Sequence, residues 1–136
     1  MRSSAFRTTG TAAASSAALV ISALGASPAQ AAGEAANGKT AFVRQCALCH
    51  TVNKDEPNSY GPNLFGILDR SAASAPGFRY SSAFRSTASS WVWTADVLGA
   101  WISAPARMVP GTTMGIFQGV ADRDKDDIIA YLASQK

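Results

Sequence analysis

Two cysteines and a histidine lie together in the pentapeptide Cys46-Ala47-Leu48-Cys49-His50. Thiols three positions apart can each add across a haem vinyl group, and the imidazole that follows is then placed to bind the iron. A redox disulfide and half of a zinc site are competing interpretations, but the chain has 2 cysteines and 1 histidine, too few for the roughly four ligands of structural zinc. No βαβ pattern of a thioredoxin-like site surrounds the pair. The pentapeptide therefore predicts one covalent haem c, attached through Cys46 and Cys49.

The residue types alone leave the second iron ligand open. With 1 histidine in the chain, a second imidazole from the same molecule is excluded. Methionine, lysine, a small exogenous molecule or an open position remain. Met108 and Met114 flank Pro110 and Gly111, whose turn can hold a thioether in a fixed place. Either methionine satisfies this argument.

The first 31 residues differ in character from the rest of the chain. Arg2 and Arg7 precede an apolar run at 17–24, and Ala29-Gln30-Ala31 offers small residues for cleavage. This pattern is typical of a secretory signal peptide. A retained membrane anchor is the competing interpretation, but the run is well short of the roughly 20 residues that span a bilayer. We therefore expect residues 1–31 to be cleaved on export to the periplasm, and residues 32–136 to form one domain without stable membrane insertion.

Charge argues against a nucleic-acid partner. The whole chain has a net charge of +3, from 12 basic and 9 acidic residues. Without Arg2 and Arg7 the count is 10 basic against 9 acidic residues, a net charge of +1. A nearly neutral mature domain lacks the basic surface that nucleic acids bind.

Apolar periodicity predicts an all-α domain. Residues 34–49 have Gly38, Phe42 and Cys46 at four-residue spacing, which places them on one helix face. Residues 51–90 are rich in Gly, Pro, Ser and Asn and predict a long loop that wraps the cofactor.

Two further helices follow this loop. Thr94 is a candidate N-cap for a helix that Pro105 closes. The last helix begins among the aspartates of 122–127, where acids suit a helix N-terminus, and buries Ile128, Ile129, Tyr131 and Leu132.

Over residues 34–136 the chain resembles class I cytochromes c of the mitochondrial and bacterial c2 type. The matching segments are Gly38, Phe42, Cys46-Ala47-Leu48-Cys49-His50, Gly61-Pro62-Asn63-Leu64, Arg70, 75–80, Trp93, 110–114 and 128–132. The resemblance implies an all-α fold with three main helices and long loops wrapped around one covalently bound haem.

The resemblance also implies roles for individual residues. Met114 is the axial ligand opposite His50, and Met108 merely lines the loop. Gly38 and Phe42 meet Ile128 and Tyr131 where the first and last helices cross. The implied cofactor-binding residues are Cys46, Cys49, His50, Pro62, Arg70, Tyr80, Trp93, Thr112 and Met114. The Pro62 carbonyl accepts a hydrogen bond from His50. Arg70, Tyr80 and Trp93 surround the haem propionates, and Thr112 bonds a propionate or pocket water.

Three positions depart from the family pattern. Trp101 stands where a tyrosine often lies near the methionine sulfur. Phe84 stands about where an asparagine commonly supports a buried water, which predicts a less polar pocket. Gly115 resembles an insertion after the ligand, so the alignment is least secure there.

The implied function is that of a soluble monohaem electron carrier, not an enzyme. Its expected redox partners are a dehydrogenase or bc1-type complex as donor and a terminal oxidase or reaction centre as acceptor. The alternatives are a tightly bound subunit of an oxidoreductase complex for sulfite, thiosulfate or alcohol oxidation, and an open-site ligand-binding or peroxidatic haem protein. We expect a monomer.

Docking charges are sparse. Positions that hold lysines in the mitochondrial type are Gln45, Ala106 and Thr113 here, which leaves Arg44, Arg107 and Lys54. This substitution predicts weak electrostatic steering.

Overall fold

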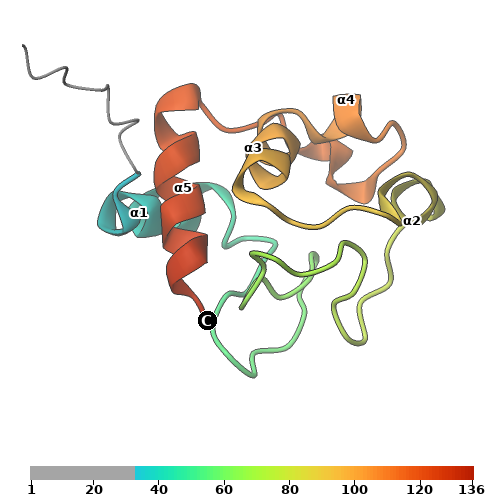
Figure 1. Ribbon diagram of the computed structural model, residues 1–136, viewed down its shortest axis with the longest axis horizontal. Helices are drawn as coiled ribbons and strands as arrows, with labels where there is room; N and C mark the ends of the chain where they lie inside the picture. Colours follow the sequence, from blue (N-terminus) through green and yellow to red (C-terminus); the bar gives the residue numbers. More distant parts are fainter. Residues whose placement is uncertain (1–32) are drawn as a thin grey trace, which may run out of the picture.

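The computed structural model describes residues 33–136, so the predicted signal peptide at 1–31 lies outside the described residues. Within that range the chain forms helices joined by long loops, with no strand beyond an isolated bridge between Ser71 and Val92. The elements are α1 (Ala35–Gln45), α2 (Ser82–Ala88), α3 (Ala95–Ser103), α4 (Pro105–Met108), the 3₁₀ turn η1 (Thr113–Ile116) and α5 (Asp122–Ser134). Figure 1 shows α1 and α5 crossing at one side of the molecule, with the loops and α2 on the other.

The crossing of α1 and α5 depends on Gly38. A Cβ at Gly38 would overlap the backbone carbonyl of Asp127 and lie 2.8 Å from Cβ of Tyr131. Glycine therefore permits the close approach that brings the Phe42 and Tyr131 rings to a centroid distance of 5.4 Å. Ile128 is fully buried beside them. The predicted contact between the first and last helices is confirmed.

Polar bonds fasten both ends of this crossing. The Glu34 amide donates to Oδ1 of Asp127 at 2.7 Å. The Asp124 carboxylate accepts from Nη2 of Arg44 at 2.9 Å and from Nε2 of Gln45 at 2.8 Å. Asp124 lies in the first turn of α5, where the helix dipole also favours its negative charge.

Helix α1 ends four residues earlier than the predicted end at Cys49. The carbonyl of Phe42 accepts from the amides of both Cys46 and Ala47, at 2.7 and 3.0 Å, which breaks the regular hydrogen-bond pattern. The amides of Cys49 and His50 then both bond the Cys46 carbonyl. The expected helix through the cysteines is wrong in this detail, because a tight turn presents both thiols.

The expected long loop at 51–90 contains helix α2. Ser81 caps it by accepting from the Phe84 amide at 3.1 Å, and Phe84 and Ala88 are buried one turn apart. Thr94 caps α3 as predicted, accepting from the Val97 amide at 3.2 Å. Pro105 does follow α3, but it also begins α4, since proline suits the first turn of a helix.

No helix between residues 33 and 136 has the length and apolar character needed to cross a membrane.

Candidate haem site

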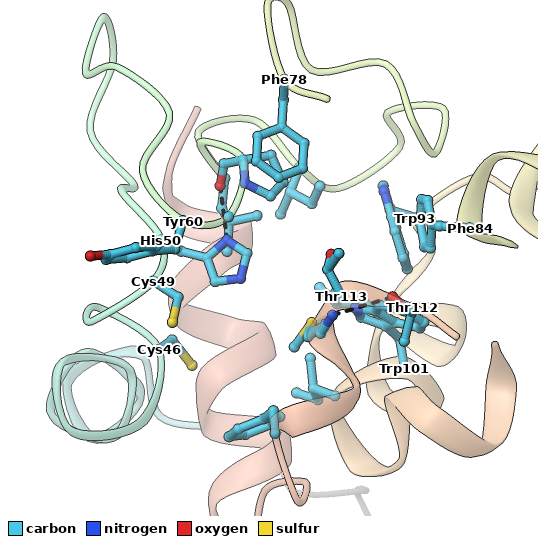
Figure 2. A pocket seen from close by; sticks show the side chains of 18 of the residues that line it. Cys46, Cys49, His50, Tyr60, Phe78, Phe84, Trp93, Trp101, Thr112 and Thr113 are labelled. Atoms are coloured by element: carbon cyan, nitrogen blue, oxygen red, sulfur yellow. Dashed lines mark hydrogen bonds between the residues drawn. The ribbon is translucent and has the colours of Figure 1, made fainter. Parts of the chain in front are cut away.

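A deep, mainly apolar pocket lies between the loops and the helices. Every one of the nine residues predicted to bind the cofactor lines it: Cys46, Cys49, His50, Pro62, Arg70, Tyr80, Trp93, Thr112 and Met114. Figure 2 shows the two thiols and the His50 imidazole on one side, and Thr112 and Thr113 across the pocket. The structure therefore assembles residues from six separate segments around one space.

The two thiols line one side of this pocket (Figure 2). Both cysteines are half-buried and both thiols are free, as attachment to a haem vinyl group requires. Burial, with a smaller contribution from the neighbouring Cys49, raises the pKa of Cys46 to about 11. The Cys46 thiol is therefore protonated at neutral pH.

The imidazole of His50 is held by backbone atoms. Its Nδ1 lies 2.9 Å from the carbonyl oxygen of Pro62. A carbonyl oxygen only accepts, so Nδ1 carries the proton and the lone pair of Nε2 is free to bind a metal. Burial lowers the pKa of His50, and the bond to Pro62 partly opposes this shift. The ring is therefore kept neutral, as a metal ligand must be.

Gly61 supports one face of that ring. A Cβ at Gly61 would lie 2.6 Å from Nδ1 of His50, closer than real side chains approach. The Gly61 amide also donates to the Cys49 carbonyl at 2.7 Å, which ties this residue to the turn that bears the thiols. The pentapeptide and the Gly61-Pro62 segment thus form one rigid unit.

Met114 reaches the pocket from η1. Thr112 precedes this turn, and its hydroxyl accepts from the Met114 amide at 3.4 Å. The Met114 carbonyl accepts from the Phe117 amide at 3.0 Å, which closes the turn. Met108, in α4, is half-buried and does not belong to the pocket lining. Of the two methionines that the residue types left open, the structure brings Met114 to the site.

Arg70 supplies an unused donor inside the pocket. Its Nη1 and Nη2 donate to the carbonyls of Phe65 and Asn63, both at 3.0 Å. Its Nε is buried and has no hydrogen-bond partner among residues 33–136. A buried donor without an acceptor is costly. A carboxylate of the cofactor would satisfy it, so this part of the pocket fits a haem propionate.

Tyr80 and Trp93 complete the same region. The Tyr80 hydroxyl accepts from the Ala75 amide at 3.2 Å, which leaves its own proton free to donate. Burial raises the pKa of Tyr80, opposed by that hydrogen bond and by the charge of Arg70. Burial lowers the pKa of Arg70, opposed in turn by Tyr80. The buried Trp93 is joined to Arg70 by a backbone hydrogen bond of 3.0 Å.

An aromatic wall forms one side of the pocket. The Phe84 ring stacks on Tyr80 and Trp93 with centroid distances of 5.4 and 6.2 Å. It meets the edge of Trp101 at 5.1 Å, and Phe84 and Trp101 are both buried. Two of the three departures from the family pattern, Phe84 and Trp101, thus pack together. The hydrocarbon ring of Phe84 makes this side of the pocket apolar.

Asn63 is a positioning residue. The sequence analysis named it within a matching segment but predicted no role for it. Its Nδ2 is within hydrogen-bond distance of the Thr51 hydroxyl and the carbonyls of Asn53 and Glu56, at 2.9, 3.0 and 3.2 Å. Its own carbonyl accepts from Arg70. Its place directly after Pro62 was the one signal in the sequence for this role. The hydrogen-bond partners could not be predicted from it, because they lie up to 12 residues away in the chain.

These features define a small helical protein that holds a single covalent haem. The Cytochrome c family model matches residues 35–136. Cytochrome c2 of Rhodopila globiformis is 44% identical over 105 residues, covering 76% of this chain and 95% of that protein. Cytochrome c2 of Blastochloris viridis is 40% identical over 103 residues (75% and 78%), and cytochrome c of Stellaria longipes is 36% identical over 100 residues (74% and 91%).

The chain belongs to the cytochrome c family. It has the all-α class I fold, carries covalent haem c and serves as an electron carrier rather than an enzyme.

Proposed function

We propose that this chain is a periplasmic, monomeric carrier whose haem iron is bound by His50 and Met114. The observation that carries the proposal is that two potential iron ligands line one pocket. They are Nε2 of His50, whose Nδ1 is bonded to Pro62, and the thioether sulfur of Met114. With both side chains bound, the iron would have no position left for a substrate, which favours electron transfer over catalysis. The expected donor is a dehydrogenase or bc1-type complex, and the expected acceptor is a terminal oxidase or reaction centre.

Bound haem supplies an iron that alternates between the ferric and ferrous states. Cys46 and Cys49 would anchor the group to the turn after α1, while Pro62 fixes the orientation of His50. Arg70, Tyr80, Trp93 and Thr112, which line the pocket, would supply donors to the propionates. The aromatic wall around Phe84 excludes water, so few groups need to reorient when the charge changes.

Spectroscopy of the holoprotein tests the ligand assignment. We expect a c-type pyridine haemochrome and a weak red band from charge transfer between iron and a thioether. Absence of that band, together with ready binding of carbon monoxide to the reduced protein, would favour the open-site alternative.

Cell fractionation tests the location. After expression in a bacterial host with a periplasmic haem-attachment system, we expect the product in the periplasm, with residues 1–31 removed and its mass increased by one haem. Recovery of the full-length chain in the membrane fraction would contradict cleavage and export.

Respiratory membranes from the source organism test the place in electron transfer. Quinol should reduce the added holoprotein, and an inhibitor of bc1-type complexes should block this reduction if that complex is the donor. Reduction that continues with the inhibitor present would identify a dehydrogenase as the donor, while no reduction by membranes would contradict the proposed pathway. Reoxidation after the quinol is exhausted reports on the acceptor.

A further inference from the structure

Exposed apolar side chains gather around the mouth of the haem pocket. The large hydrophobic residues exposed in the described chain are Val43, Leu48, Tyr60, Val92 and Ile116. Three of them are 83–86% exposed, namely Leu48, Tyr60 and Ile116. Tyr60 and Ile116 line the pocket, and Leu48 lies between the two cysteines that line it. We call these three residues the apolar rim.

The apolar rim comes from segments that the fold holds together. The Gly61 amide donates to the Cys49 carbonyl, which places Tyr60 beside the turn that carries Leu48. Figure 2 shows the Tyr60 ring next to His50, with its hydroxyl directed away from the pocket. Ile116 ends η1, the turn that presents Met114. Leu48, Tyr60 and Ile116 therefore lie within two residues of Cys49, Pro62 and Met114, which are predicted to hold the cofactor.

Charge is sparse around this opening. The described pocket lining has no lysine, aspartate or glutamate, and Nη1 and Nη2 of its arginine, Arg70, bond to backbone carbonyls. Gln45, Ser81 and Thr113, polar residues of the lining that are at least partly exposed, are uncharged. Arg44, next to Gln45, is paired with Asp124 at 2.9 Å. The residues that line the opening thus offer little attraction to a charged surface, and the exposed Arg107 and Lys54 lie outside that lining.

We infer that the apolar rim is the docking surface for a redox protein that presents an uncharged, apolar surface of its own. This inference rests on the proposed carrier function and specifies the chemistry of its partner. Complementary interfaces match charge with charge, and a charged partner face would lose its water here without gaining a counter-charge. Exposed tyrosine and aliphatic side chains instead supply contact area near the redox centre.

Other occupants match the rim less well. A stable self-dimer buries a large apolar interface, whereas the pocket lining beside these three side chains also includes polar residues such as Gln45 and Thr113. A lipid surface attracts clusters of basic residues, and the described pocket lining contains Arg70 alone of that class. Apolar contacts interspersed with uncharged polar groups are typical of a transient protein interface.

Protein-film voltammetry tests this inference without knowledge of the partner. The holoprotein is adsorbed on gold coated with either a methyl-terminated or a carboxylate-terminated monolayer, as defined apolar and anionic faces. We expect electron exchange on the methyl surface, unaffected between about 10 mM and 1 M salt, a range over which the Debye length falls from about 30 to 3 Å. The triple variant Leu48→Ser, Tyr60→Ser, Ile116→Ser should reduce the adsorbed amount by about tenfold or more.

Val43→Ser is the matched control, because Val43 is 62% exposed on α1 and does not belong to the pocket lining. It should adsorb like the unmodified protein. If the triple variant fails to fold, Leu48→Ser alone retains the test, since Leu48 does not line the pocket. Exchange on the carboxylate surface that salt abolishes, with no effect of the rim substitutions, would overturn the inference.

Two further measurements separate the other occupants. A dimer in sedimentation velocity that the triple variant loses would assign the rim to a second copy, and cosedimentation with neutral phosphatidylcholine vesicles would assign it to lipid. Either result contradicts the proposed partner. Reversible reduction of each holoprotein by small mediators in solution tests the carrier function separately, so that its failure is distinguishable from failure of the docking inference.

Discussion

Nδ1 of His50 lies 2.9 Å from the carbonyl oxygen of Pro62, so a backbone atom sets the orientation of the imidazole. This bond assigns the proton to Nδ1 and directs Nε2 to the cofactor. Because the acceptor belongs to the main chain, the geometry depends on the path of the backbone through Gly61 and Pro62. Substitutions that shift this path should therefore alter the haem site without removing any ligand.

Gly61→Ala should displace His50, because the added Cβ would lie 2.6 Å from Nδ1. We expect a lower yield of holoprotein, a weakened low-spin spectrum and a loss of stability of about 1–3 kcal/mol, as for other overpacked sites. Absorption spectra and denaturant unfolding measure these effects. Gly115→Ala is the control, since its Cβ would meet atoms no nearer than 3.7 Å. Equal behaviour of the two variants would refute the steric role of Gly61.

Met114→Ala should open the second iron position. The iron–thioether band should disappear, the reduced protein should bind carbon monoxide, and the reduction potential should fall because a thioether stabilises the ferrous state. Met108→Leu should retain the band and the potential, since Met108 does not belong to the pocket lining. A band that survives Met114→Ala but disappears in Met108→Leu would assign the ligand to Met108 instead.

The residues that assemble the pocket could be predicted because the chemistry is local to short motifs. Cysteine spacing places two thiols and His50 within five positions, and no other cysteine or histidine competes for their roles. The residue types alone did not choose between Met108 and Met114, because that choice depends on how η1 turns toward the pocket. The family resemblance favoured Met114, and the structure brings that residue to the site.

Helix ends and surface features were harder to predict. Helix α2 was missed because it has 7 residues within a serine-rich stretch and depends on tertiary burial of Phe84 and Ala88. The predicted end of α1 was too late in the chain. The amides of Cys46 and Ala47 both donate to the Phe42 carbonyl, and the spacing of apolar residues does not indicate this change in hydrogen bonding. Exposure of Leu48 and Ile116 was not predicted, since burial is the common fate of such residues.

Arg70→Met should destabilise the protein and lower its reduction potential. The substitution leaves the carbonyls of Phe65 and Asn63 without their donors, at a cost of about 1–3 kcal/mol for each group that remains buried. It also removes a positive charge near the haem. Loss of that charge stabilises the ferric state, the more positive of the two, relative to the ferrous state and so lowers the potential. Potentiometric titration and denaturant unfolding measure both effects. Arg79→Met, at an exposed position, should change neither quantity. An unchanged potential in Arg70→Met would argue against a location beside the propionates.

Glu56→Gln should weaken the loop before Pro62 in a pH-dependent way. The Asn53 side-chain and backbone amides, with the Val52 amide, donate to the Glu56 carboxylate at 2.8, 3.0 and 3.2 Å and hold its pKa below the ordinary 4.5. A lowered pKa in the folded state means that the ionised group stabilises the fold above about pH 4.5, and that this contribution is lost as the pH falls through the lowered value.

Thermal unfolding of the Glu56→Gln holoprotein from about pH 3 to 6 measures this contribution. The variant should unfold at a lower temperature than the unmodified protein near pH 6, and the two curves should converge toward pH 3. Glu34→Gln is the control, because the bond from Glu34 to Asp127 is made by its backbone amide rather than its carboxylate. A constant difference between Glu56→Gln and the unmodified protein at all pH values would show that the carboxylate charge is not the cause.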